Sequence, residues 1–548
     1  MATPATSIID TRGHQMFPTL QPAEIERLRR FGEARAFAAG DYPARVGTVS
    51  PGLMIILSGS VDVTQRGEGD NGQLIVTHTP GSFMGELAQL SGRPALVDAR
   101  AREPVEALII PPDRLRAVLI AEAELGERIM RALILRRVGL IQTGAGGPVI
   151  IGPPENGDVL RLQNFLSRNG HPHQSLDPET DNCARTLVER FHVDPGQLPI
   201  VLCPNGQILH NPSERGLARC IGMVRPIDPD RVYDVCIIGA GPAGLAAAVY
   251  AASEGLSVAA LDCRSFGGQA GASARIENYL GFPTGISGMA LMGRAYSQAQ
   301  KFGAEITIPI EAGSLHAGPA PGKPVTLKVG ESERLNARSV VIASGARYRR
   351  LGVKNLEQFE AASVHYWASP LEANLCAGQE VALVGAGNSA GQAVVYLADR
   401  VSKVYLLVRG GDLAASMSRY LVDRIGSLRN VEVVTGAEVS ALEGSDGALE
   451  AIRWRLKSGE EVRRPLRHLF LFIGAQPNTD WLAGSGISLD PKGFILTGAD
   501  VGDGRRPLET SLPGIFAIGD VRSGSVKRVA ASVGEGAQVV AALHGFLG

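Results

Sequence analysis

Two stretches in the second half of the chain share one glycine-rich pattern: Asp234-Val-Cys-Ile-Ile-Gly-Ala-Gly-Pro-Ala-Gly244 and Glu380-Val-Ala-Leu-Val-Gly-Ala-Gly-Asn-Ser-Ala390. Each begins with an apolar run typical of a buried strand and continues into an Ala-rich, helix-compatible segment, residues 245–252 and 392–398. Glycines at such turns let the backbone approach a pyrophosphate, which then lies against the positive N-terminal end of the helix. The repeated pattern predicts two dinucleotide sites and therefore electron transfer between two cofactors.

The strand that follows each loop ends on a different kind of residue. In the first unit, Ser257-Val-Ala-Ala-Leu-Asp262 ends on a carboxylate, which is placed to accept hydrogen bonds from ribose hydroxyls and suits FAD or NAD. In the second, Lys403-Val-Tyr-Leu-Leu-Val-Arg409 ends on a cation, which favours the 2′-phosphate of NADPH over NADH. The alternative is a solvated arginine at a strand end. Arg419 is the candidate for a second positive charge.

Composition indicates an ordinary globular protein of several domains. The chain has 548 residues, 45% of them hydrophobic and 20% charged, and a formal net charge of -1. The first residues show no basic region followed by an apolar core, and no apolar run reaches membrane-spanning length. We therefore expect a cytoplasmic location, without nucleic-acid or membrane partners. Six cysteines are scattered without any Cys-x-x-Cys, so neither a metal site nor a dithiol motif is predicted.

The first 223 residues differ in pattern from the rest. Short strand-like runs separated by glycine turns fill residues 18–110 and predict a β-roll or small barrel. Residues 122–141 have helical periodicity, and their basic side chains are expected to face solvent. Residues 148–223 then alternate strand and helix signals as in a compact α/β module. The basic residues of that helix are Arg128, Arg131, Arg136 and Arg137.

Residues 232–548 resemble the small bacterial thioredoxin reductases, two-domain flavoproteins that use FAD and NADPH. Besides the two loops, matching motifs are Phe266-Gly-Gly-Gln269, Glu277-Asn-Tyr279, Ile342-Ala-Ser-Gly345 and Thr510-Ser-Leu-Pro-Gly-Ile-Phe-Ala-Ile-Gly-Asp520. The resemblance implies that Asp520 contacts the ribityl chain, that Gln269 and Asn278 lie beside the flavin, and that Arg528 lies near the isoalloxazine. It also implies a homodimer.

The loops and the resemblance together give two sets of cofactor-binding residues. The FAD set is Gly239, Gly241, Pro242, Ala243, Gly244, Asp262, Gly268, Gln269, Asn278, Gly345, Gly519, Asp520, Arg528, Val529 and Ala530. The NADPH set is Gly385, Gly387, Asn388, Ser389, Ala390, Arg409 and Arg419.

The N-terminal roll resembles a cyclic-nucleotide-binding domain through Gly81-Ser-Phe-Met-Gly-Glu-Leu-Ala88. In that family the glutamate accepts the ribose 2′-hydroxyl, and an arginine a short way along the chain binds the cyclic phosphate. Here Ala95 and Leu96 stand at the places of that arginine, while Arg93 and Arg100 lie nearby but out of register. Two interpretations stay open: a roll that binds a cyclic nucleotide, or one that is structural or takes another ligand. The candidate ligand residues are Gly85 and Glu86.

The middle module resembles a thioredoxin or glutaredoxin fold, with Pro199 at the position of that family's cis-proline. Its catalytic Cys-x-x-Cys would follow the first strand, where this chain reads Pro153-Pro-Glu-Asn156. We therefore expect this module to be redox-inactive.

These assignments predict an α/β multidomain protein. A β-roll with a C-terminal helix is expected over residues 1–145 and a thioredoxin-like α/β module over 146–228. Two nested Rossmann-like domains follow, an FAD-binding domain over 229–351 and 464–548 and an NAD(P)H-binding domain over 352–463.

The chain departs from the thioredoxin reductases at the pair of cysteines that carries electrons out. Aligned on Val364, the sequence reads Val-His-Tyr-Trp367-Ala-Ser-Pro370, so Trp367 and Pro370 stand where the family has two thiols. Thiol–disulfide exchange requires a thiolate, which neither side chain supplies. No residue can therefore be assigned as catalytic.

Three hypotheses remain open at this point. The first is an FAD-dependent NAD(P)H oxidoreductase that passes electrons to an unidentified acceptor, a small molecule or a redox protein. The second is a redox- or nucleotide-responsive sensor with little turnover. The third is a genuine thioredoxin-disulfide reductase that works by a non-standard route.

Overall fold

The computed structural model describes residues 8–65, 73–85, 89–90, 93–143, 146–190, 193, 197–224, 226–316, 324–330, 332–360, 362–445 and 447–548. The chain divides into two compact units, which we describe separately. The first unit is Met1–Pro154, Phe165–Pro226 and Ser297–Pro309. The second is Glu155–Asn164, Ile227–Tyr296 and Ile310–Gly548.

The N-terminal roll consists of two sheets with hydrophobic cores. One sheet has the order β1-β7-β2-β5 and the other β4-β3-β6, and all of the pairs are antiparallel. β2 is buried over most of its length, which explains its continuous apolar run. The strands are β1 (Glu33–Phe37), β2 (Leu53–Ser58), β3 (Val61–Gln65), β4 (Gln73–His78), β5 (Phe83–Met84), β6 (Asp98–Ala101) and β7 (Val105–Ile110).

Helices close one side of the roll, and two of their arginines are not solvated. α4 (Ala123–Thr143) covers the predicted helix, but Arg136 and Arg137 on it are each only 8% exposed. Arg136 donates from Nε to the Met16 carbonyl and from Nη1 to the Gly85 carbonyl, both at 2.9 Å. The prediction of a solvated basic face was therefore wrong for these two residues. The other helices are α1 (Ile8–Met16), α2 (Pro22–Leu28) and α3 (Pro112–Ala121).

The middle module has the strand order β11-β10-β8-β9, with β8 parallel to β9 and antiparallel to β10. This agrees with the compact α/β module predicted there. The Leu198–Pro199 peptide bond, at the position singled out by the resemblance, is cis. The elements are β8 (Val149–Ile151), α5 (Gly157–Arg168), β9 (Gln174–Leu176), α6 (Asn182–Arg190), β10 (Ile200–Leu202), β11 (Ile208–His210) and α7 (Glu214–Cys220).

A disulfide that sequence spacing did not suggest joins two elements of this module. Cys203 follows β10 and Cys220 ends α7, and their Cα atoms lie 6.2 Å apart across a sequence separation of 17 residues. The fold brings the two sulfurs together because α7 returns to the strand that precedes β11.

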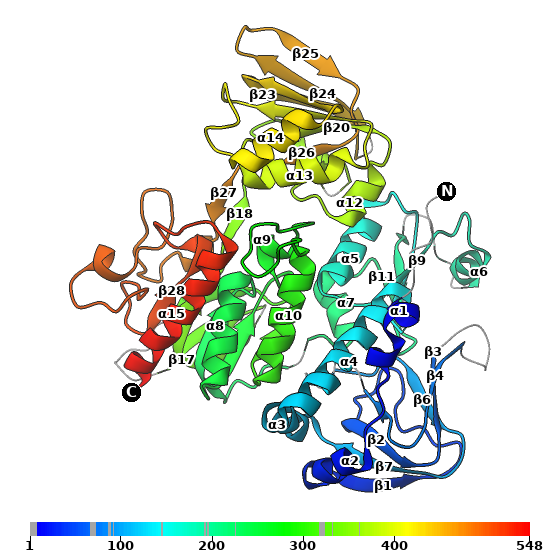
Figure 1. Ribbon diagram of the computed structural model, residues 1–548. Helices are drawn as coiled ribbons and strands as arrows, with labels where there is room; N and C mark the ends of the chain where they lie inside the picture. The colour runs from blue at the N-terminus through cyan, green and yellow to red at the C-terminus, as the bar shows by residue number, and fades with distance from the viewer. Residues whose placement is uncertain are drawn as a thin grey trace. The chain divides into compact units, whose positions relative to one another are not determined.

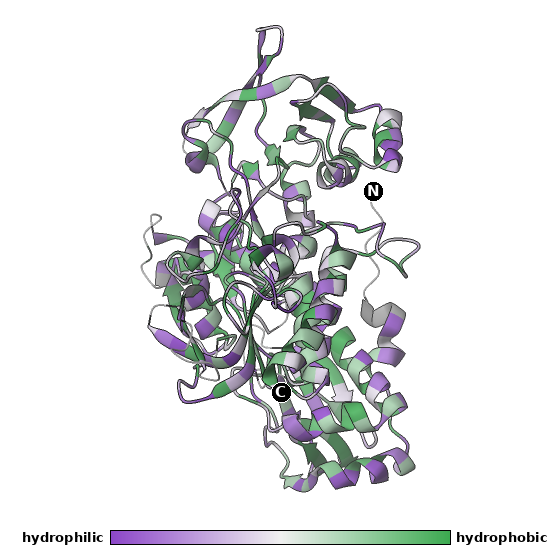
Figure 2. Cartoon of the chain, turned by 90° about the vertical axis from the view of Figure 1, so that its left-hand side faces the viewer, coloured by the Kyte–Doolittle hydropathy of each residue, from purple (hydrophilic) through white to green (hydrophobic). Residues whose placement is uncertain are grey.

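The second unit begins with a seven-stranded sheet, the first Rossmann sheet, of order β14-β13-β12-β17-β16-β15 with β28 beside β17. β12, β13, β17 and β28 are mutually parallel, and their hydrophobic residues appear green in Figure 2. α8 and α15 pack side by side (Figure 1), and a Cβ on Gly536 of α15 would lie 2.6 Å from that of Ala246. The bounds are β12 (Val232–Ile238), α8 (Pro242–Ser253), β13 (Val258–Leu261), α10 (Gly288–Lys301), β14 (Glu305–Thr307), β15 (Ala312–His316), β16 (Val325–Val329), β17 (Glu333–Ile342), β28 (Ile515–Ala517) and α15 (Val529–Leu547).

A second Rossmann sheet, of order β19-β26-β20-β21-β22, is entirely parallel and is flanked by an antiparallel sheet, β23-β24-β25. The bounds are β19 (Val364–His365), α12 (Pro370–Leu375), β20 (Glu380–Val384), α13 (Asn388–Ala398), β21 (Lys403–Val408), α14 (Arg419–Ser427), β22 (Val431–Thr435), β23 (Ala437–Ser445), β24 (Ala448–Leu456), β25 (Glu461–Arg464) and β26 (Leu469–Leu471).

The second sheet extends further along the chain than predicted. β26 falls in the range assigned to the FAD domain, yet it pairs with β19 and β20 inside the second sheet. The two crossings between the nested parts are β18 (Ala346–Tyr348) and β27 (Ala475–Pro477), which pair with each other. The inserted domain therefore ends near residue 475 rather than 463.

Candidate functional site

The first glycine-rich loop runs from β12 into α8, and each glycine meets a different requirement. Gly239 has φ +110, and a Cβ there would lie 2.2 Å from the Ala343 carbonyl oxygen. A Cβ on Gly244 would lie 1.9 Å from the Gly239 carbonyl oxygen, so this glycine permits the helix to pack on its own strand. A Cβ on Gly241 would have only the Gly268 Cα within 4 Å, at 3.9 Å. Gly241 thus leaves space that a pyrophosphate can fill.

The second loop repeats this arrangement between β20 and α13. A Cβ on Gly385, whose φ is +153, would lie 2.6 Å from the Phe472 carbonyl oxygen, whereas one on Gly387 would meet nothing within 4 Å. Gly241 and Gly387 are the N-caps of α8 and α13, and no side chain caps either helix. Their first N–H groups are thereby left for an anion. Both loops fit the phosphates of a dinucleotide.

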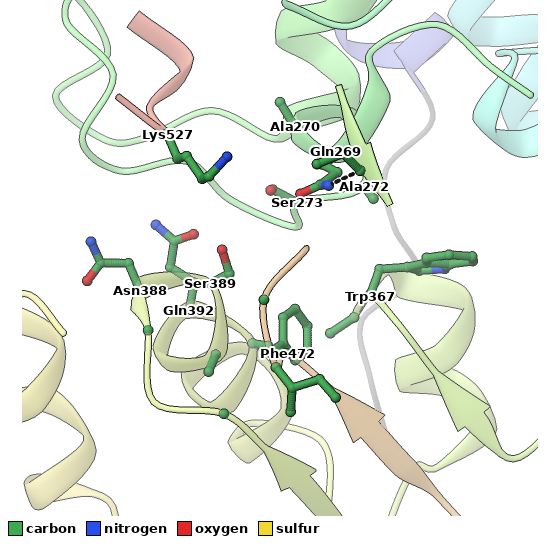
Figure 3. Close-up of a pocket in the computed structure, with 18 of the residues that line it drawn as sticks. Gln269, Ala270, Ala272, Ser273, Trp367, Asn388, Ser389, Gln392, Phe472 and Lys527 are labelled. Atoms are coloured by element: carbon green, nitrogen blue, oxygen red, sulfur yellow. Dashed lines mark hydrogen bonds between the residues drawn. The ribbon is translucent and has the colours of Figure 1, made fainter. Parts of the chain in front are cut away.

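One pocket of about 1140 Å³ in the second unit is lined by both loops. Figure 3 shows Gln269, Ser273 and Lys527 on one side of it, Asn388, Ser389, Gln392 and Phe472 on the other, and Trp367 at the edge. The volume exceeds the roughly 300–1,000 Å³ of a typical small-molecule site. Predicted residues that line it are Gly239, Gly241, Pro242, Ala243, Asp262, Gly268, Gln269, Asn278, Gly345, Gly519, Asp520, Arg528, Val529, Gly385, Gly387, Asn388, Ser389, Ala390 and Arg409.

Three predicted cofactor residues do not line this pocket. Gly244 lies behind the loop, where it serves the helix–strand contact, and Ala530 lies one residue beyond the lining of α15. Arg419 points its guanidinium at Asp423, 2.9 Å away, and its side chain is 84% exposed. Arg424, further along α14, lines the pocket instead. Sequence reasoning chose the wrong arginine to examine because it did not consider which face of α14 meets the glycine-rich loop.

Asp262 is fixed at the end of β13 by backbone donors. Its carboxylate accepts from the amides of Ala240 at 2.9 Å, Arg264 at 2.9 Å and Ser265 at 3.1 Å. The carboxylate therefore connects its own turn to the first glycine-rich loop. This places a fixed acceptor on the pocket wall, as ribose recognition requires.

Asp520 also lies on the pocket wall, in a short turn that precedes α15. Burial raises the pKa of its carboxyl, and Glu535 raises it further while Lys527 lowers it. The adjacent Gly519 has φ +70, and its amide donates to Glu535 at 2.6 Å. Since a side chain on Gly519 would come within 2.9 Å of Ala243 Cβ, this turn fits closely against α8.

Trp367 is held by a buried carboxylate. Its indole Nε1 donates to Glu372 Oε1 at 2.8 Å, and the Ser369 amide donates to Glu372 Oε2 at 2.9 Å. Glu372 is only 2% exposed, and the Ser369 hydroxyl also donates to it. Ser369 and Glu372 thus form a capping pair at the start of α12, with Pro370 as its first residue. Pro370 itself lies outside the pocket.

Among the described residues that line the pocket, none is a cysteine. Cys236 and Cys376 are fully buried, and burial raises the pKa of Cys376 to about 11. Cys263 is exposed. In the same described part of the chain, no three His, Cys, Asp or Glu side chains gather as metal ligands.

The roll shows only part of its candidate ligand site. Gly85 has φ +148, and a side chain there would collide with Gln89, so a glycine is required. Glu86 lies outside the described residues. Leu96 is buried, while the Ala95 amide and carbonyl bond to Thr48 and Gly47. Arg100, on β6, is exposed and lies over the Tyr42 ring at 6.0 Å.

Comparisons with known sequences agree with this geometry. The family model described as pyridine nucleotide-disulphide oxidoreductase matches residues 233–536, and that described as cyclic nucleotide-binding domain matches residues 34–122. The chain is 34% identical over 316 residues to NADPH-dependent thioredoxin reductase 3 of Arabidopsis thaliana, which covers 56% of each protein. It is 32% identical over 323 residues to thioredoxin reductase of Mycoplasmopsis pulmonis, which covers 56% of this chain and 95% of that protein.

Other comparisons show the same similarity. An alkyl hydroperoxide reductase of Pseudomonas aeruginosa is 34% identical over 307 residues, and the match spans little more than half of that protein, 56%. The solved thioredoxin reductase of T. acidophilum matches with a TM-score of 0.53 and 29% identity, over 58% of this chain and 99% of that one. In the described part of the chain no helix has both the length and the apolar character needed to cross a bilayer.

Proposed function

Because the chain belongs to the pyridine nucleotide-disulphide oxidoreductase family, we propose that it is an FAD-dependent oxidoreductase that uses NADPH and delivers electrons to an acceptor outside the chain. The observation that carries this proposal is the pocket lined by two glycine-rich loops of the same construction. When bound, FAD accepts a hydride from the nicotinamide and passes two electrons on.

The residues of the chain have distinct tasks in this proposal. The N-terminal ends of α8 and α13 hold the two pyrophosphates, Asp262 orients one ribose, and Asp520 holds the ribityl chain. Gln269 donates to the Ala346 carbonyl at 2.5 Å and is thereby fixed beside the expected flavin position. Since the chemistry belongs to the cofactors, the protein supplies alignment and excludes water.

The acceptor does not receive electrons through a dithiol of the reductase region. Trp367 and Pro370 stand at the positions of the family's cysteines, and the buried Glu372 holds the tryptophan in place. Neither side chain can form a disulfide or a thiolate. We therefore propose that a small molecule or a redox protein takes electrons directly at the pocket.

The test is an anaerobic titration of the FAD-loaded protein with NADPH and, separately, with NADH. We expect the flavin absorbance to bleach with NADPH, and then to recover when a quinone or ferredoxin is added but not when a disulfide such as oxidised thioredoxin is added. Absence of bleaching with both nucleotides would overturn the proposal.

The two alternatives give different results in the same experiment. Bleaching without sustained oxidation by any acceptor would favour a sensor, and rapid recovery with thioredoxin would favour a thioredoxin reductase of non-standard route. Repeating the titration with cyclic AMP or cyclic GMP tests whether the roll binds a cyclic nucleotide. Ala95 and Leu96 give the phosphate no cation, and a buried phosphate without one is costly; we expect no effect of either nucleotide.

A further inference from the structure

The pocket contains two arginines and one carboxylate where the adenosine ribose of a nicotinamide cofactor is expected. Arg409 ends β21, Asp412 follows it in the loop to α14, and Arg424 lies on α14; all three line the pocket. Resting on the proposed use of NADPH, we propose that Arg424 determines the choice of NADPH over NADH. We further propose that it leaves an ion pair with Glu277 when it binds the 2′-phosphate.

The charges next to Arg409 make that residue insufficient alone. Asp412 is an exposed carboxylate whose Oδ1 accepts the Ala414 amide at 3.0 Å, so it stays in the loop that carries Arg409. A carboxylate beside one guanidinium offsets its attraction for a phosphate and suits free ribose hydroxyls, the pattern expected for NADH. A second cation is therefore needed to favour the phosphate.

The loop before α14 is fixed to the second glycine-rich loop, which places Arg424 near the cofactor. The Ser418 amide donates to Asn388 Oδ1 at 2.6 Å, and the Ser416 hydroxyl donates to the Ala386 carbonyl at 2.8 Å. Leu421, on the same face of α14 as Arg424, is buried and also lines the pocket. Arg419 is directed elsewhere by Asp423, so the two arginines of this helix are not equivalent.

The present partner of Arg424 is weakly held. Nη1 of Arg424 lies 3.3 Å from Glu277 Oε1 and 3.5 Å from Oε2, and the two side chains are 47% and 27% exposed. A pair this long and exposed is worth about 0–1 kcal/mol. A charge-assisted contact with a phosphate is stronger, so the phosphate is expected to win the competition.

Glu277 does not lose its only cation when Arg424 leaves. Arg275 Nε lies 3.6 Å from the same Oε1 atom, so the carboxylate keeps a partner. Glu277 belongs to the first nucleotide-binding region and Arg424 to the second, which means that NADPH binding and the contact between the two regions compete for one guanidinium.

Equilibrium binding of NADP⁺ and NAD⁺ to the oxidised, FAD-loaded full chain tests this inference without turnover. We expect R424Q to weaken NADP⁺ binding about tenfold and to change NAD⁺ binding less than about twofold, because only the phosphate contact is lost. E277Q removes the competitor and should tighten NADP⁺ binding about two- to threefold, with NAD⁺ unchanged.

Two further variants separate the possible causes. R455Q is the matched control, since Arg455 forms an exposed pair with Glu461 at 3.2 Å and lies outside the pocket; neither nucleotide should respond to it. A loss of NADP⁺ binding in R419Q but not in R424Q would overturn the inference, and so would an equal loss of both nucleotides in R424Q. Flavin bleaching by NADPH with no NADP⁺ preference would contradict this inference alone, whereas absence of bleaching contradicts the proposed function.

Discussion

His365 Nε2 lies 3.1 Å from His468 Nδ1 in the interior of the second Rossmann sheet, and the two rings stack with centroids 5.3 Å apart. His365 begins the approach to Trp367, and His468 precedes β26, the strand beside it. Burial lowers the pKa of His365 to about 3 and that of His468 to about 4. The pair is therefore neutral in the folded protein, and one ring donates its N–H to the other.

The histidine pair predicts a loss of stability in mild acid. Both pKa values lie below the ordinary 6.5, so the unfolded chain takes up protons that the folded chain refuses as the pH falls below 6.5. Each such histidine costs about 2 kcal/mol at pH 5. The unfolding temperature should therefore drop between pH 7 and 5, a range above the lowered carboxyl pKa values of Glu24 and Asp234. H365Q should flatten this slope, whereas H316Q, at an exposed position, should leave it; an unchanged slope in H365Q would contradict the prediction.

Arg136 predicts a different dependence of the roll on a single guanidinium. It bonds two carbonyls from α1 and from the loop at Gly85, and it lies over the rings of Phe83 at 4.6 Å and Phe17 at 5.2 Å. Burial lowers its pKa to about 9, yet it remains charged at neutral pH. Losing the two charge-assisted bonds in R136M should destabilise the roll by about 3 kcal/mol.

Limited proteolysis and thermal unfolding measure this effect. R136M should expose α1 to proteases at lower temperature than the parent chain, because its anchor at Met16 is gone. The matched control is R131Q, since Arg131 is exposed and pairs with Glu127 on its own helix. Equal protease sensitivity of R136M and R131Q would show that Arg136 does not anchor α1.

The contrast between these arginines explains which parts of the molecule the sequence could predict. Gly239 and Gly385 were identified because a close backbone crossing at a strand-to-helix turn excludes every other residue, and that requirement is local. Asp262 was identified for the same reason, since it ends the next strand of the same unit. Arg136 was misjudged because helical periodicity does not distinguish an arginine that faces solvent from one that bonds buried carbonyls.

Features that join distant segments were not predictable from spacing. β26 was assigned to the wrong domain because its partners, β19 and β20, precede it by many residues. Arg424 was missed because its position depends on how α14 packs on the second glycine-rich loop. Cys203 and Cys220 showed no motif, and only the return of α7 to β10 brings them together.

The Cys203–Cys220 disulfide predicts that reductant destabilises the middle module. Its Cα separation of 6.2 Å lies in the ordinary range, and the bond closes a loop over a sequence separation of 17 residues. Such a loop contributes about 3 kcal/mol through the restricted unfolded chain. C203S/C220S should therefore unfold at lower temperature than the oxidised protein and lose the dependence on dithiothreitol. C263S, which changes an exposed free thiol, should keep that dependence; a C203S/C220S protein as stable as the parent would contradict this prediction.

The thiol-free pocket predicts that electron transfer survives alkylation. Cys236 and Cys376 are buried with raised pKa values, so neither supplies a thiolate, and Cys263 is removed as C263S because it adjoins Asp262. Reduction of this variant by NADPH under anaerobic conditions, followed by iodoacetamide, should leave acceptor-dependent NADPH oxidation within about twofold of the untreated enzyme. W367C/P370C in the same background should gain two alkylated residues, counted by intact mass, which verifies that reagent reaches the loop. Loss of oxidation in the alkylated C263S protein would mean that electrons leave through a cysteine after all.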